Sequence, residues 1–179
     1  MPTEDQNRHW FVMRSLTNEL KMEAILQANK FECFLPKRIR TRKIREKTRV
    51  EVVPAVSVYL FVHSDYASLY SFKQQTPGLL FTKVLNSSDS HSTMKVADKE
   101  MEDFIRVATQ KEQESRLFRP DEVELSRGQR IRIHGGPLSG VEGELVKVKG
   151  LRDKRLVISI PGIISVMTLV DRNLIQLIK

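Results

Sequence analysis

The chain has 179 residues, which is enough for one ordinary domain or two small ones, and it carries a net charge of +8. With 40% hydrophobic and 29% charged residues, its composition is typical of a globular protein. No apolar run approaches the roughly 20 residues of a membrane-spanning helix, and the polar start is unlike a signal peptide, so we expect a cytoplasmic protein. Cys33 is the only cysteine, which excludes an internal disulfide and a cysteine-based metal site.

The first part of the chain alternates strand and helix patterns. Residues 10–13 form a short apolar strand, and Thr17 or Asn18 is placed to cap a helix. The apolar residues of this helix recur on one face: Met22, Ile25 and Leu26. Residues 31–35 then return to a strand pattern, and the phenylalanines beside Cys33 indicate a core position for the thiol.

A concentrated basic segment follows. Eight basic residues stand against one acid, Glu46, so the segment holds +7 of the net charge: Lys37, Arg38, Arg40, Arg42, Lys43, Arg45, Lys47 and Arg49. Arginines alternate with Ile39 and Thr41, as in one arm of an extended hairpin. Such a patch predicts sequence-independent, salt-sensitive attraction to nucleic-acid phosphates. The alternative is a solvated loop whose charge only keeps the protein soluble.

Beyond this segment, strand and helix patterns alternate again. Residues 52–62 are strongly β-forming, and Ser64 or Asp65 opens a second helix that Pro77-Gly78 ends. Residues 79–85 predict a further strand, and the polar residues 86–93 a loop. Asp98 then caps a third helix with its apolar residues on one face: Met101, Phe104, Ile105 and Ala108. The order βαββαβ plus one helix predicts an α+β fold of the ferredoxin-like kind.

The remainder of the chain predicts a second, all-β domain. Residues 110–124 are charged and poor in apolar side chains, which indicates a linker between domains at 1–109 and 125–179. From Gly128 to Val148, alternating apolar residues surround a glycine-rich turn, which predicts strand, turn and strand. Further on, β-branched residues dominate 157–170, and Pro161-Gly162 would interrupt any helix, so we expect strands there too.

The segment around the turn resembles the KOW motif. In the family pattern this motif lies inside a small five-stranded barrel of the SH3-like type, in NusG-type transcription factors and some ribosomal proteins. The resemblance rests on six residues at characteristic spacings: Gly128, Gly136, Pro137, Gly140, Glu142 and Gly143. The alternative is an unrelated hairpin with a glycine-rich turn.

With both halves in view, the chain resembles the NusG family, in which an N-terminal NGN domain precedes a C-terminal KOW domain. The matching segments of the first half are Trp10-Phe11-Val12, Asn18-Glu19, Phe34-Leu35-Pro36, residues 59–62, Thr76-Pro77-Gly78 and residues 96–101. Within the family the chain is most similar to UpxY-type antiterminators of polysaccharide operons in Bacteroidales. That likeness rests on Val52-Val53-Pro54, residues 101–104, residues 136–145 and residues 162–165.

The resemblance implies a transcription elongation or antitermination factor that suppresses pausing or termination. It implies RNA polymerase as partner, bound at the clamp helices of its largest catalytic subunit by Tyr59, Phe61 and Phe34. DNA or nascent RNA would be the second partner. The ribosome or Rho would bind the KOW domain, although Pro161-Gly162-Ile163 stands where the family usually has Phe-Gly-Arg. The resemblance implies no cofactor and no membrane, and we expect a monomer.

Three other classes of protein are alternatives to this interpretation. An enzyme is disfavoured, because the glycine-rich turn lacks the Gly-Lys-Ser/Thr of a phosphate-binding loop and no serine lies in a nucleophile elbow. The four histidines are scattered, so we also expect no metal site. A ribosome-bound KOW protein would explain the charge but not the NGN-like half. A general elongation factor is the alternative to the specialised antiterminator.

Overall fold

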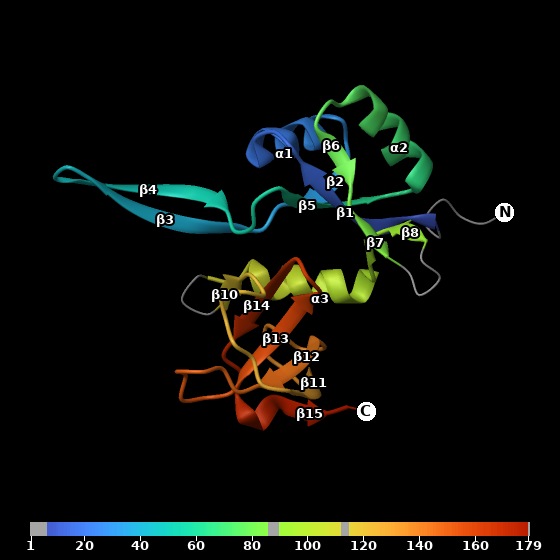
Figure 1. Ribbon diagram of the computed structural model, residues 1–179. Coiled ribbons are helices and arrows are strands. Elements are labelled where there is room, and N and C mark those ends of the chain that lie inside the picture. The colour runs from blue at the N-terminus through green and yellow to red at the C-terminus, as the bar shows by residue number, and fades with distance from the viewer. Residues whose placement is uncertain (1–6, 86–89, 112–114, 179) are drawn as a thin grey trace. The chain divides into compact units, whose positions relative to one another are not determined.

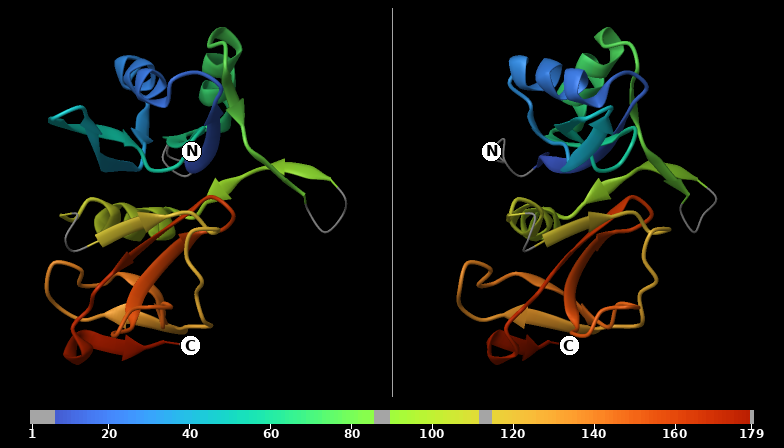
Figure 2. Two further views of the ribbon diagram at one scale, coloured as in Figure 1. Left: turned by 60° about the vertical axis from the view of Figure 1, so that its left-hand side comes forward. Right: turned by 90° about the vertical axis from the view of Figure 1, so that its left-hand side faces the viewer.

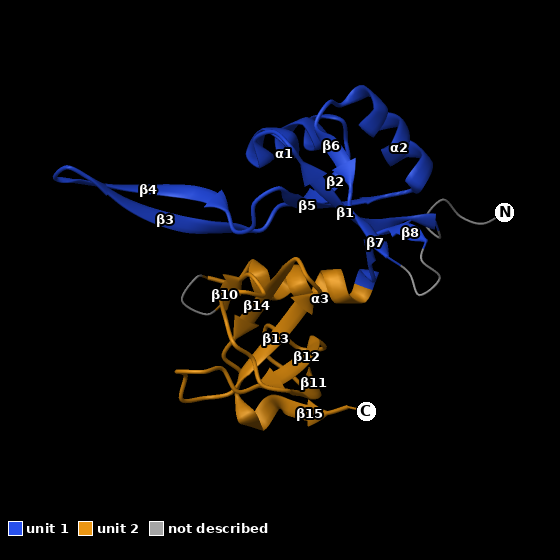
Figure 3. Cartoon of the chain, in the orientation of Figure 1, with its two compact units in different colours: residues 1–98 blue, residues 99–179 orange. Residues whose placement is uncertain are grey.

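The protein is described from a computed structural model, which covers residues 7–85, 90–111 and 115–178. The chain divides into two compact units, residues 1–98 and 99–179, each with its own main sheet (Figure 3). The described residues contain three α-helices and fifteen strands, which makes this a mixed α/β protein (Figure 1). No helix among them is long and apolar enough to cross a membrane.

The main sheet of the first unit has the antiparallel strand order β2-β5-β1-β6, and a short strand also pairs with β1. Its strands are β1 (His9–Ser15), β2 (Glu32–Phe34), β5 (Tyr59–Ser64), β6 (Leu79–Phe81) and β9 (Lys95–Val96). Helix α1 (Glu19–Ala28) connects β1 to β2, and α2 (Tyr66–Gln75) connects β5 to β6. The predicted βαββαβ order is therefore present, with further strands inserted into it.

Local sequence decides where both helices begin. The Asn18 side chain accepts a hydrogen bond from the Lys21 backbone N–H at 2.9 Å, which makes Asn18 the cap of α1. Asp65 caps α2 in the same way, accepting from the Ser68 backbone N–H at 2.8 Å. That hydrogen bond holds the pKa of the Asp65 carboxyl below its ordinary value. At each start, the second of the two predicted capping residues is the one that is used.

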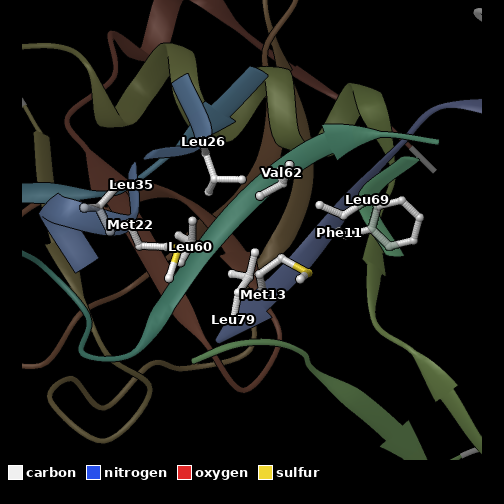
Figure 4. Packing of buried hydrophobic residues seen from close by; sticks show 9 residues of the cluster. All are labelled: Phe11, Met13, Met22, Leu26, Leu35, Leu60, Val62, Leu69 and Leu79. Atoms are coloured by element: carbon white, nitrogen blue, oxygen red, sulfur yellow. The ribbon is translucent and has the colours of Figure 1, made fainter. Parts of the chain in front are cut away.

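Both helices lie on one face of the sheet, and the core of the unit lies between them and the strands (Figures 2 and 4). It contains nine buried side chains: Phe11, Met13, Met22, Leu26, Leu35, Leu60, Val62, Leu69 and Leu79. Successive strand residues point to opposite faces, so the residues between these on β1 and β5 point away from the helices. The sheet therefore has an apolar second face, which bears on function.

Two hairpins accompany this sheet: β3 (Lys37–Ile44) pairs with β4 (Lys47–Pro54), and β7 (Lys83–Leu85) pairs with β8 (His91–Thr93). The single strand predicted over 52–62 is wrong, because β4 and β5 are separate strands. Val58 has a φ of 66°, which a continuous strand does not allow. The loop predicted over 86–93 is wrong at residues 91–93, which form β8, and 86–89 lie outside the described residues.

The second unit has the antiparallel strand order β10-β14-β13-β12-β11-β15. Its elements are α3 (Asp98–Ala108), β10 (Ser115–Phe118), β11 (Gln129–Ile133), β12 (Glu142–Val146), β13 (Arg155–Ile160), β14 (Ile164–Thr168) and β15 (Ile175–Leu177). Strand β10 lies inside the segment predicted to be a linker. Its Phe118 is buried in a cluster with residues of β12, β13 and β14. These contacts are long-range, so the charged local sequence did not predict the strand.

The position of Cys33 leads to a first prediction. The residue is half-buried in β2 against the core, and its Sγ lies 3.9 Å from the Glu23 carbonyl oxygen. Burial raises the pKa of the Cys33 thiol to about 11, so the thiol stays protonated at neutral pH. We expect slow maleimide labelling of the native protein at pH 7 and fast labelling in denaturant, followed by mass spectrometry. Equally fast labelling in both states would contradict the buried position.

Candidate functional sites

The sheet face opposite α1 and α2 brings together the three aromatic residues assigned to polymerase binding by resemblance. Phe34 on β2 is directly opposite Phe61 on β5, so their side chains share a face. Tyr59 is two residues before Phe61 on the same strand and therefore points the same way. From β1, Val12 is opposite Phe61 and continues the apolar row. Strand pairing thus assembles one aromatic and aliphatic surface from three strands.

Exposure differs along this row. Phe61 is 0% exposed and Val12 is also fully buried, whereas Tyr59 and Phe34 are half-buried. Tyr59 and Phe34 therefore present aromatic surface that a partner protein can contact. Phe61 has no exposed surface for a partner to contact, a difference that the alternating sequence pattern did not reveal.

A polar group that sequence reasoning missed lies at one end of this face. The Trp10 ring stacks on His63 with centroids 5.0 Å apart, and His63 Nδ1 lies 2.7 Å from a Glu32 carboxylate oxygen. Arg8 donates to the His63 carbonyl oxygen at 3.1 Å. The sequence did contain a signal for His63. Residues two apart on a strand point to the same side, so His63 shares a face with Tyr59 and Phe61. An apolar centre with a polar rim is typical of protein interfaces.

The second candidate site is the β3–β4 hairpin, which contains all eight basic residues assigned to nucleic-acid binding. The predicted extended hairpin is confirmed, so the segment is an ordered ribbon and not an irregular loop. Every one of its cations is exposed: Lys37, Arg38, Arg40, Arg42, Lys43, Arg45, Lys47 and Arg49. Lys37 pairs with Glu23 at 2.6 Å, and Arg40 pairs with Glu51 at 2.7 Å.

The third candidate site is the turn between β11 and β12, where the KOW-like residues Gly136, Pro137 and Gly140 lie. Both glycines have positive φ values, 69° and 82°, which explains why glycine stands there. Gly128 precedes β11, while Glu142 and Gly143 begin β12. Arg132 donates two hydrogen bonds to one Glu142 carboxylate oxygen, at 2.6 and 2.9 Å, and these hold the pKa of Glu142 below its ordinary value.

Within the second unit, helix α3 is bound to this turn by polar contacts. Lys99 Nζ donates to the Gly140 carbonyl oxygen at 2.9 Å, and Arg106 donates to the Pro137 carbonyl oxygen at 2.9 Å. Asp103 Oδ2 accepts from the Glu142 backbone N–H at 3.0 Å. These contacts are consistent with the grouping of α3 with the second compact unit, which begins at residue 99.

Sequence reasoning also missed Asp103, which is only 2% exposed. Lys99 Nζ lies 2.6 Å from its other carboxylate oxygen, Oδ1, and balances its charge. A buried carboxylate needs such partners, since an unpaired charge in the interior is costly. The available signal was an acid placed between the apolar helix positions Met101 and Phe104.

The described residues contain no group of three or more His, Cys, Asp or Glu side chains arranged to hold a metal ion. In a comparison with protein families, residues 8–105 match a model described as transcription termination factor NusG. The matched residues include the aromatic sheet face and the basic hairpin but not the KOW-like turn. None of the curated proteins matches the chain significantly.

Proposed function

Since the chain belongs to the NusG family, whose members are transcription factors that interact with RNA polymerase and are not enzymes, we propose that it suppresses pausing or termination during elongation. The observation that carries this proposal is the aromatic sheet face. Phe34 and Tyr59 are half-buried aromatic residues on the sheet face opposite α1 and α2. Aromatic anchors of this kind supply much of the binding energy at protein interfaces.

In the proposed complex, this face binds the clamp helices of the largest catalytic subunit of the polymerase. Tyr59 and Phe34 are the contact residues, while Phe61 lies on the same face but has no exposed surface. The basic hairpin adds a second partner, DNA or nascent RNA in the elongation complex, because its exposed cations attract phosphate regardless of sequence.

For the rest of the chain we propose an NGN domain over residues 1–109, a connecting segment over 110–124 and a KOW domain of the SH3-like barrel type over 125–179. The family match ends at residue 105, near the end of α3, which supports the first boundary. The positive-φ glycines of the β11–β12 turn support the KOW assignment. Rho and the ribosome are its candidate partners.

Within the family we propose a specialised antiterminator of polysaccharide operons of the UpxY type, with a general elongation factor as the second candidate. Transcription of two templates by the cognate polymerase separates these. We expect read-through on a polysaccharide-operon leader and none on an unrelated leader of equal length. Equal read-through on both templates would favour the general factor.

Binding to purified core RNA polymerase is the direct test of the proposed function. We expect the full chain to co-elute with core polymerase in gel filtration and to shorten pauses in single-round transcription. Washed ribosomes at the same concentration serve as the comparison. Retention on ribosomes alone would contradict the proposal and favour a ribosome-associated protein.

A further inference from the structure

The β3–β4 hairpin separates its side chains into two chemically different faces. Residues directly opposite in the ladder share a face, as do residues two apart on one strand. One face carries every arginine of the two strands, with four other side chains: Arg38, Arg40, Arg42, Ile44, Lys47, Arg49, Glu51 and Val53. The other face carries five β-branched residues, two lysines and a proline: Lys37, Ile39, Thr41, Lys43, Thr48, Val50, Val52 and Pro54. We name the first set the arginine face.

Charge is unevenly compensated along the arginine face. Glu51 lies opposite Arg40, accepts a hydrogen bond from its Nε atom at 2.8 Å and forms an ion pair with its Nη2 atom at 2.7 Å. Closer to the turn, Arg42 is directly opposite Arg49, and neither forms an ion pair with another described residue. Like charges directly opposite in a ladder destabilise it. An anion bound between the two guanidinium groups is attracted by both and offsets their mutual repulsion. Phosphate suits this position, because arginine binds it with two parallel hydrogen bonds.

The dimensions of the ribbon favour a double helix as the source of the phosphates. Successive arginines of β3 are two residues apart, roughly 6.8 Å along the strand, which is about twice the 3.4 Å rise per nucleotide of a duplex strand. A two-stranded ribbon fits the major groove of B-form DNA, whereas the major groove of A-form RNA is deep and narrow. The arginine face has no aromatic side chain on which an unpaired base could stack.

We propose that the arginine face grips the phosphate backbone of duplex DNA, with Arg42 and Arg49 holding the backbone between them. The β3–β4 ribbon reaches beyond the sheet of the first unit (Figure 1), and Arg42 and Arg49 are both exposed. Only one side of the hairpin therefore binds DNA. This inference deepens the proposed function, on which it rests, by naming the nucleic acid and the side chains that hold it.

The test measures binding of the full chain to a 20-bp DNA duplex by fluorescence anisotropy at several salt concentrations. Changing Arg42→Gln and Arg49→Gln together removes one to two phosphate contacts, so the slope of log K against log salt should fall by roughly 0.9 to 1.8. Binding should be about tenfold weaker or more at 0.1 M salt. The matched variant is Lys43→Gln, which removes a cation from the opposite face beside Arg42, and we expect a smaller loss than for Arg49→Gln alone.

Three outcomes would overturn the inference. Equal losses of DNA affinity for Lys43→Gln and Arg49→Gln would show that both faces of the hairpin contribute equally to binding. Tighter binding to a single strand or an RNA duplex of the same length would show a different nucleic acid. An unchanged slope for the double variant would exclude the arginine pair.

The same variants are also assayed for binding to core RNA polymerase without nucleic acid. Retained polymerase binding with lost DNA binding supports the arginine face. A wild-type chain that binds DNA through this face but does not bind polymerase would contradict the proposed function alone. Retained polymerase binding with an unchanged DNA slope would contradict the arginine face alone.

Discussion

Replacing Tyr59 by alanine is expected to weaken binding to core RNA polymerase by about 2 kcal/mol or more, roughly thirtyfold in Kd, while the protein stays folded. Tyr59 is half-buried on the sheet face opposite α1 and α2, so part of the residue is accessible to a partner. An aromatic anchor lost from the centre of an interface leaves the partner's pocket unfilled. Biolayer interferometry gives the affinity, and a thermal melt of the same preparation gives the stability.

Two further variants give this experiment its controls. Phe61 is fully buried, so Phe61→Ala should cost about 3–5 kcal/mol of folding stability whether or not the residue contributes to binding. Tyr70 is 41% exposed but belongs to α2, on the other side of the sheet, so Tyr70→Ala should bind polymerase normally. A strongly destabilised Tyr59→Ala variant without a separable binding defect would assign Tyr59 to the core.

Local patterns in the sequence predicted the order of helices and main-sheet strands in the first unit. Capping residues identify where α1 and α2 begin, and Asn18 and Asp65 perform this role through bonds to backbone N–H groups within three residues. Alternation within β1 and β5 identifies the two faces of the sheet, because side-chain direction in a strand depends only on position. Strand pairing then placed Phe34 beside Phe61, which no local pattern contains.

The features that the sequence concealed depend on contacts between distant residues. Strand β10 has a charged neighbourhood, and only its pairing with β14, about fifty residues later along the chain, buries Phe118. The contacts of α3 with the second unit include Asp103, which accepts a hydrogen bond from the backbone N–H of Glu142, 39 residues later. The two faces of the basic hairpin follow from its register, which the turn at Arg45 determines. The composition of this segment shows that it is basic, but it does not show which face of the hairpin carries the arginines.

Gly143→Ala is expected to destabilise the protein by about 1–3 kcal/mol through overpacking. A Cβ at this position would lie 2.7 Å from Leu156 Cδ1 and 2.7 Å from the Val157 carbonyl oxygen. The leucine side chain is able to move, but the carbonyl belongs to β13, which pairs with β12, and moving it disturbs that ladder. For a unit of this size each kcal/mol corresponds to roughly 4–8 °C in Tm, so a circular dichroism melt of the full chain is sufficient.

Gly150→Ala is the matched control for this substitution, because it separates steric overlap from backbone strain. Gly150 has a φ of 83°, and no heavy atom lies within 4 Å of the point that an alanine Cβ would occupy. Alanine there therefore meets only the cost of a left-handed backbone, about 1–2 kcal/mol. Gly143 has no such φ, so the cost of Gly143→Ala comes from overlap with β13 and not from backbone strain. A Gly143→Ala variant as stable as the wild type would show that β12 and β13 separate without cost at this point. The KOW-like glycine would then serve a partner and not the packing of the sheet.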